Sequence, residues 1–344
     1  MAENDHQDIE PNSVQYLIGI HFLPPELLAD VFSYLSNNRP LRLRHALLVC
    51  HLWYNTIVHN PNLWSTIRID REFFARFAGS HSARAEAFTR SCLERSSSVP
   101  LHIILDELVD PKDIREATIE RVALVGQILG VKNIAHIRRC VSFSWTMVKA
   151  DLETSSLGEA LPKELEMLEF LHISDFDVHQ NDLVSHFPKC PSLKEVHLVN
   201  HIESNGRPYF TNEDFARVEK LTFDNQSAWI EHDISCISRF RSIHTLVLRD
   251  LSSASRRTQW YINQDKQLVA RLPSLQKLRL VGLIMSRLLC RLDVPALQEV
   301  QVEDDELERH SLWEIPRGVL RSVTSLFVIV PSPLELGAGE AHTD

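Results

Sequence analysis

The sequence predicts an α/β protein in which a short helical module is followed by a solenoid of stacked strand-and-helix units with a curved parallel sheet. Three observations carry this prediction. Helical apolar patterns occupy the first 65 residues, one apolar motif recurs about every 25 residues from Leu168 onward, and turn-forming residues follow nearly every copy. A chain of 344 residues exceeds what one compact core usually covers, which agrees with an elongated solenoid.

The N-terminal segment is predicted to be a flexible tail over residues 1–16. Met1–Asn12 is acidic and nearly free of large apolar residues, so burial cannot offset the entropy lost on ordering it. A helix is predicted to follow, from Pro24 to Leu35. Two prolines suit its first turn, and Glu26 complements the positive end of the helix dipole. Its apolar side chains form one broad face: Leu27, Leu28, Val31, Phe32 and Leu35.

A second helix is predicted from about Pro40 until Asn60 and Pro61 stop it. Its apolar residues recur at helical spacing, at Ala46, Cys50, Trp53 and Ile57. Short helices like these enclose too little interior to bury so much apolar surface. Part of that surface is therefore expected to face a partner. The alternative is an ordinary helical hairpin that packs on the rest of the chain.

Two stretches of this region, LPPELLADVFSYL and RHALLVCHLWYNTIVHNPNLW, resemble the F-box, a three-helix module, over residues 17–65. The chain departs from the family at His51 and Tyr54, where F-boxes often carry basic residues. The resemblance implies docking onto the Skp-family adaptor of cullin ubiquitin ligases. It assigns adaptor contacts to the residues that match the family pattern: Leu23, Pro24, Glu26, Leu27, Val31, Leu35, Val49, Cys50 and Trp53.

The second half of the chain repeats one pattern seven times: an apolar residue, two variable residues, an apolar residue, one variable residue and a third apolar residue. The third members are 25, 25, 25, 32, 22 and 26 residues apart, which is a leucine-rich-repeat period. The middle members are expected to point inward on neighbouring parallel strands, because only stacking buries them: Leu171, Val196, Leu221, Leu246, Leu278, Val300 and Leu326.

Helices are predicted between these strands at 181–187, 229–240 and 264–272, so that residues 166–332 form an irregular leucine-rich-repeat solenoid and 333–344 a flexible tail. These units resemble the repeat tails of F-box proteins, particularly the large fungal sets whose repeats are irregular.

Residues 66–165 are predicted to be degenerate early repeats or a linking region. Strands are expected at TIRID, PLHIILDEL and RRCVSFSW, and helices at Ala83–Arg95 and Ile114–Leu129. The alternative is a separate small helical domain.

The variable positions of the strands line the concave face of such a solenoid. On three adjacent rows they hold four cations and one anion, a local charge of +3 in a chain of net charge −10. These rows predict a strip for an acidic or phosphorylated segment of a substrate: Lys220, Thr222, Thr245, Arg249, Lys277 and Arg279. The alternative is a row of solvated charges that serves solubility.

Composition argues against several classes of function. The net charge of −10 repels nucleic acid, and the longest apolar runs are far shorter than a membrane helix. Six widely spaced cysteines indicate reduced thiols and a cytoplasmic or nuclear protein. No catalytic motif occurs, so we expect neither enzyme activity nor a cofactor. The best metal candidates, His186, Cys190, His197 and His201, lack the paired spacing of closed zinc sites, so no metal is expected.

The sequence therefore predicts the substrate-recognition subunit of an SCF-type (Skp, cullin, F-box) E3 ubiquitin ligase. Its partners would be the Skp-family adaptor, cullin through that adaptor, and a protein substrate of unknown identity. Its contribution to catalysis would be proximity alone. The alternative is a scaffold that binds proteins without directing degradation.

Overall fold

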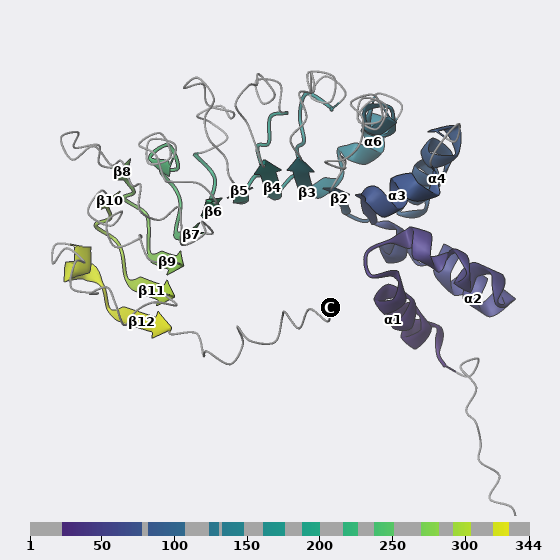
Figure 1. Ribbon diagram of the computed structural model, residues 1–344, viewed down its shortest axis with the longest axis horizontal. Coiled ribbons are helices and arrows are strands. Elements are labelled where there is room, and N and C mark those ends of the chain that lie inside the picture. The colour runs from purple at the N-terminus through teal and green to yellow at the C-terminus, as the bar shows by residue number, and fades with distance from the viewer. Residues whose placement is uncertain are drawn as a thin grey trace, which may run out of the picture.

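The computed structural model describes residues 23–77, 82–106, 124–130, 133–147, 161–175, 188–199, 216–225, 237–250, 270–281, 292–303 and 319–329. A small helical module opens the described chain. A ten-stranded parallel sheet follows it and curves into an arc, with the module at one end and the last strand at the other (Figure 1).

The helical module begins with α1 (Pro25–Ser36), which has proline in its first turn and ends at Asn37 in the left-handed conformation. Two 3₁₀ helices follow, η2 (Pro40–Arg44) and η3 (Ala46–Leu48), and then α2 (His51–Val58) and η4 (Pro61–Trp64). The prediction of one continuous helix from Pro40 is wrong. Cys50 has an extended backbone, φ −161° and ψ 168°, which is incompatible with a helix and separates η3 from α2.

The module has a core of its own and contacts helix α4 through a cation–π pair. Leu28 and Phe32 of α1 are fully buried, and the Phe32 ring meets Trp53 of α2 edge to face, with centroids 5.1 Å apart. The Trp64 indole donates to the Ile57 carbonyl at 2.8 Å. Arg95, at the end of α4 (Ser82–Arg95), lies over the Trp64 ring at 4.5 Å, so α4 contacts the module directly.

The arc is one sheet whose strands pair in sequence order and in parallel. These strands are β1 (Thr66–Ile69), β2 (Leu101–Leu105), β3 (Cys140–Met147), β4 (Phe170–Asp175), β5 (Glu195–Val199), β6 (Lys220–Asn225), β7 (Thr245–Asp250), β9 (Lys277–Val281), β11 (Glu299–Glu303) and β12 (Ser325–Ile329). They line the inner side of the arc (Figure 1). The short strands β8 (Ala270–Arg271) and β10 (Leu292–Asp293) pair with each other on its outer side.

The seven predicted inward residues occupy one register line across neighbouring strands, from Leu171 of β4 to Leu326 of β12. This prediction of parallel pairing is confirmed. The first six are at most 1% exposed, as stacking requires, but Leu326 is 49% exposed. β12 is the edge strand of the sheet. Leu326 therefore packs against β11 on one side and has no neighbouring strand on the other.

Residues 66–147 contribute the first three strands of this same sheet, at the positions where TIRID, PLHIILDEL and RRCVSFSW predicted strands. The predicted helix at 83–95 is α4; of the helix predicted at 114–129, residues 124–129 are described and helical. The short helices α3 (Arg71–Arg76), α6 (Ile134–Ile137) and η9 (Val319–Ser322) complete the described elements with assigned bounds.

The helices predicted between later strands are mostly outside the described residues. Residues 181–187, 229–236 and 264–269 fall there, and the described end of the second prediction contains a turn at 238–239. The third prediction is wrong at its end, because Ala270 and Arg271 form β8 and pair with Leu292 and Asp293. Backbone pairing on the outer side of the arc has overridden the helical pattern there.

The described cysteines are free thiols. Complete burial raises the pKa of Cys92 to about 12, and burial does the same for Cys140, so neither is a reactive thiolate near neutral pH. Cys236 and Cys290 lie outside the described residues. Among the described helices, none combines the length and the apolar character needed to cross a bilayer.

Candidate protein-docking surfaces

The helical module exposes a concentration of large apolar side chains, which we call the apolar face. Seven of the twelve exposed large hydrophobic residues in the described part of the chain lie between positions 27 and 54. The most exposed are Tyr34 at 87% and Leu48 at 83%. Together they are Leu27, Tyr34, Leu35, Leu48, Val49, Leu52 and Tyr54. Exposed apolar patches of this kind mark protein-interaction sites.

The spacing along α1 explains why these side chains are outside. Leu28 and Phe32 are one helical turn apart and face the small core, where both are fully buried. Leu27 and Leu35 lie on the adjacent stripe and are 50% and 51% exposed. The broad apolar face predicted from the sequence is thus divided: one stripe builds the module and the other faces solvent.

The predicted adaptor contacts divide in the same way. Pro24, Glu26, Leu27, Leu35 and Val49 are exposed. The remaining four are partly buried in the module: Leu23, Val31, Cys50 and Trp53.

Four members of the apolar face were missed: Tyr34, Leu48, Leu52 and Tyr54. Leu48 and Leu52 flank the break at Cys50, and treating positions 40–60 as one helix assigned them no exposed face. Recognising that break would have found Leu48 and Leu52, whereas Tyr34 lies on α1, seven residues after Leu27.

The inner side of the arc carries the predicted strip, and every cation in it has a carboxylate partner on the same or a neighbouring strand. Lys220 pairs with Glu195 at 2.7 Å and Lys277 with Glu299 at 3.0 Å. The other two pairs are Arg249 with Asp224 at 3.2 Å and Arg279 with Glu303 at 2.7 Å. Thr222 is buried and Thr245 is half-buried between these pairs.

The predicted local charge of +3 is therefore corrected, because four carboxylates balance the four cations once strands β5 and β11 are included. The predicted charge was counted over β6, β7 and β9 alone. It therefore left out Glu195 on β5 and Glu299 and Glu303 on β11. The cations occupy the middle strands β6, β7 and β9. The strip is neutral as a whole, with positive charge at its centre and negative charge at both margins.

A polar cluster lies beside the strip, where His172 of β4 and His197 of β5 are register partners. Their rings meet edge to face, with centroids 4.4 Å apart, and His197 Nε2 is 2.9 Å from Asp224 Oδ2. Burial lowers the pKa of His172 to about 4, and the nearby His197 adds to the effect against the opposing charges of Asp224 and Asp106. His172 is therefore neutral at pH 7.

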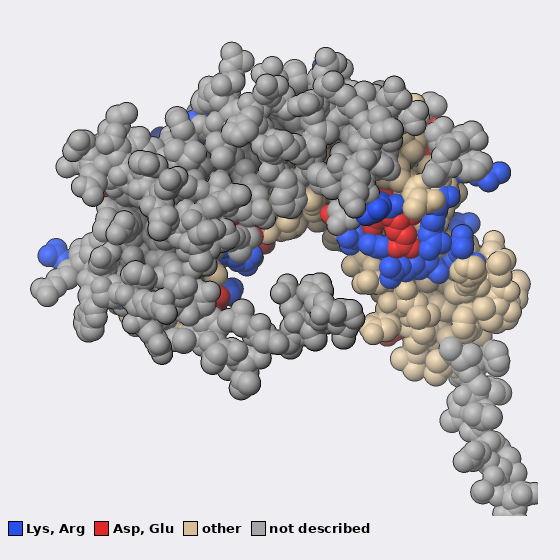
Figure 2. Space-filling model, in the orientation of Figure 1, with Lys and Arg blue, Asp and Glu red and all other residues tan. Residues whose placement is uncertain are grey.

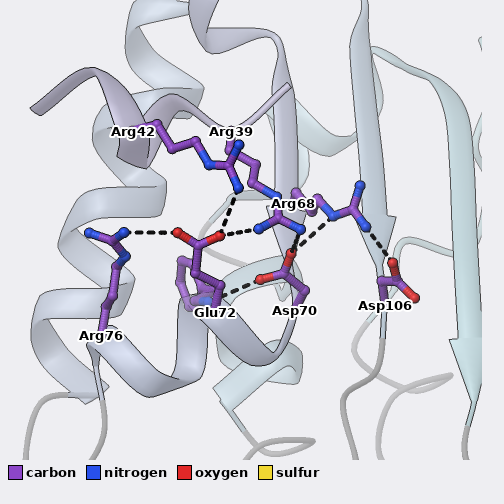
Figure 3. A network of polar contacts seen from close by, with 8 residues as sticks. Arg39, Arg42, Arg68, Asp70, Glu72, Arg76 and Asp106 are labelled. Carbon is purple, nitrogen blue, oxygen red and sulfur yellow. Dashed lines mark hydrogen bonds and ion pairs between the residues drawn. The ribbon is translucent and has the colours of Figure 1, made fainter. Parts of the chain in front are cut away.

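A network of ion pairs, which we call the junction network, links the helical module to the first two strands (Figure 3). Asp70 and Asp106 directly follow β1 and β2, and the carboxyl ends of these parallel strands lie at one edge. Asp70 is 2.8 Å from Arg39 of the module and 3.0 Å from Arg68, which reaches Asp106 at 2.5 Å. Asp70 also caps α3 by accepting the Phe73 N–H at 3.0 Å.

Glu72 of α3 is the second centre of this network. It pairs with Arg39, with Arg42 at 3.3 Å and with Arg76 at 2.8 Å. Burial acts to raise the pKa of the Glu72 carboxyl, but hydrogen bonds from Arg76, Arg42 and Arg39 outweigh it and hold the pKa below its ordinary value. The network fixes η2 against β1 and α3, so the apolar face and the arc are held in one orientation.

Two of the four candidate metal ligands, Cys190 and His197, lie in the described part of the chain, and each has another partner. The Cys190 thiol is buried and donates to the Pro188 carbonyl at 3.2 Å, and His197 bonds to Asp224 instead. His186 and His201 lie outside the described residues. Within the described ranges, no three His, Cys, Asp or Glu side chains converge as metal ligands.

Comparison with known proteins identifies the helical module. Residues 20–70 match the F-box-like family model, a span that contains the whole apolar face together with Asp70 and Arg39 of the junction network. No curated protein matches the chain. The chain therefore carries an F-box-like domain, and such domains typically bind Skp-family adaptors in SCF-type complexes.

Proposed function

We propose that this chain is the substrate-recognition subunit of an SCF-type ubiquitin ligase. The F-box-like domain binds the Skp-family adaptor and, through it, cullin. The arc, which we interpret as irregular leucine-rich repeats of the kind found in fungal F-box proteins, holds the protein to be ubiquitinated. The chain itself supplies no chemistry, and it acts in the cytoplasm or nucleus by bringing its target close to the ubiquitin-carrying subunits.

The observation that carries this proposal is the apolar face on a domain that matches the F-box model. An isolated helical pair that packed only on its own chain would bury those side chains. Here Tyr34 and Leu48 are more than four-fifths exposed. A partner that covers these side chains removes apolar surface from water, and that burial is the favourable term that must offset the entropy lost on association.

The strip on the inner side of the arc is proposed as the target-binding surface. Its central cations have side chains 34–59% exposed, so they can exchange their carboxylate partners for those of another protein. An acidic or phosphorylated segment would lie over Thr245, between the cations of β6 and β9. Negative charge at the margins would exclude segments whose acidic groups are more widely spread.

Co-purification tests the proposal against its alternative. The full-length chain is expressed with a tag, and its adaptor and cullin content is measured. Stoichiometric adaptor and cullin support the ligase subunit, whereas adaptor without cullin supports a non-degradative scaffold. Absence of both contradicts the proposed function.

A full-length Leu27→Ala/Leu48→Ala variant then serves as a trap, because it is expected to lose the adaptor but keep its target. Proteins enriched on this variant, and ubiquitinated only with the wild type, are the expected substrates.

A further inference from the structure

An open groove lies at the C-terminal end of α1, where the apolar face meets the junction network. Tyr34 and Leu35 line it from α1, and Arg42 lines it from η2. Asn37 and Asn38, both with positive φ, form the turn that brings these elements together. The groove is open to solvent along its length, so a side chain of another protein can enter it without displacing any part of this chain.

Arg42 is the most exposed arginine of the junction network, with its side chain 39% exposed. Its contact with Glu72, at 3.3 Å, is longer than the 2.8 Å contact between Arg76 and the same carboxylate. That carboxylate also pairs with Arg39. A guanidinium has five N–H donors. Within the described residues the Arg42 guanidinium donates one hydrogen bond, so it retains donors for another carboxylate.

The surroundings of Arg42 favour a negatively charged occupant. The junction network contains four arginines and three carboxylates, and Figure 2 shows this basic rim directly above the largely uncharged surface of the F-box-like domain. Asp30 also lines the groove, but the carboxylate that Arg42 contacts is that of Glu72. The groove thus offers apolar contact at Tyr34 and Leu35 and one available cation at its margin.

We infer that this groove receives an acidic side chain of the Skp-family adaptor, whose carboxylate pairs with Arg42 while the adaptor covers Tyr34 and Leu35. This inference rests on the proposed function, since it requires adaptor docking on the apolar face. It adds a charged contact to an interface otherwise built from apolar side chains. Because Arg42 also contacts Glu72, the adaptor would become linked to the same network that orients the arc.

The test measures adaptor affinity of the full-length chain by titration calorimetry from 50 to 500 mM NaCl. Wild type is compared with Arg42→Gln, Arg42→Lys and the control Arg271→Gln, which removes another exposed and paired arginine at 3.4 Å from Asp293. Arg42→Gln is expected to weaken binding about three- to tenfold at low salt and to flatten its salt dependence. Arg42→Lys retains the charge and should fall between Arg42→Gln and wild type. The control should match wild type.

Two different results would overturn different claims. If wild type binds the adaptor and Arg42→Gln shows the same affinity and the same salt dependence, Arg42 makes no contact and the inference fails alone. If folded wild type does not bind the adaptor at all, the proposed function fails and the inference fails with it. Urea unfolding of each variant confirms that affinities are compared between folded proteins.

Discussion

The F-box-like domain and the inner side of the arc present surfaces of opposite character. The domain leaves large apolar side chains in water, whereas the strip of the arc pairs each of its four cations with a carboxylate. Apolar burial is non-directional and scales with area, which suits one constant partner. Exposed ion pairs contribute little stability but distinguish partners by the position of charge. Under the proposed function, the first surface would serve assembly and the second would serve target selection.

The junction network lies between these two surfaces and connects the helical module to the first strands of the arc. Arg39 contacts Asp70 and Glu72, so a residue of the module meets the end of β1 and the start of α3. Partly buried pairs of this kind hold one geometry only while every member is present, because removing one partner leaves a poorly solvated charge. Substitutions in the module, in the junction network and on the arc are expected to have successively smaller effects.

The largest effect is expected inside the module. Phe32→Ala removes a fully buried ring that packs on Trp53, and it should destabilise the protein by about 3–5 kcal/mol. Leu48→Ala, in the same module but on the apolar face, should change stability by less than about 0.5 kcal/mol. Urea unfolding followed by tryptophan fluorescence measures both. Equal destabilisation by the two variants would show that Leu48 belongs to the core.

The next largest effect is expected in the junction network. Asp70→Ala removes the cap of α3 and the partner of Arg39 and Arg68, so it should cost about 2–3 kcal/mol of unfolding free energy. Asp70→Asn retains an acceptor for the cap, and the difference between the two variants isolates the cap from the ion pairs. Thermal unfolding provides the comparison. Unchanged stability in both variants would show that Asp70 and its ion pairs do not stabilise the contact between the module and the sheet.

Charge reversal on the arc should affect target capture more than stability. Arg249→Glu/Arg279→Glu places like charges beside Asp224 and Glu303 and should destabilise by about 1–2 kcal/mol. If the strip binds targets, the adaptor-deficient trap should lose its captured proteins when these two changes are added. Arg271→Glu, on β8, is the matched control and should retain them. Undiminished capture by the double variant would show that the strip does not bind targets and is a row of solvated charges.

The smallest effect is a pH dependence at His172. Its pKa of about 4 lies below the ordinary value of 6.5, so the unfolded chain binds this proton first as pH falls. Stability should therefore decline between about pH 6.5 and 4, and because the ring is partly exposed and solvent screens its charge, the whole decline should stay below about 1 kcal/mol. Urea unfolding at pH 7 and pH 5 tests this. His172→Gln should show a shallower decline than wild type, and identical slopes would contradict it.

The sequence predicted the parallel sheet well because its period is encoded in buried side chains. Leu221 and Leu246 recur 25 residues apart and lie side by side on β6 and β7. The helical module was predicted less accurately, since local apolar spacing cannot reveal the extended backbone at Cys50 that exposes Leu48. Short segments depend on tertiary contacts that periodicity does not report.

The candidate surfaces show the same limit. The alternation of side chains along each strand predicted which residues face the inner side of the arc. It could not predict their ion pairs, because Lys220 and Glu195 are 25 positions apart and meet only through the strand register. Likewise, Arg68 and Asp106 have no local relation in the sequence and meet where β1 and β2 end. Long-range charge partners require the fold before they can be assigned.

Adaptor binding by the apolar face is the central claim, and titration calorimetry with recombinant Skp-family adaptor tests it most directly. Leu27→Ala/Leu48→Ala should lose about 2–4 kcal/mol of binding free energy, a roughly 30- to 1,000-fold rise in Kd, while urea unfolding remains unchanged. Leu326→Ala is the matched control, because Leu326 is 49% exposed, against 50% for Leu27, and lies at the opposite end of the arc. It should bind like wild type. A folded double variant that binds the adaptor as tightly as wild type would contradict the account.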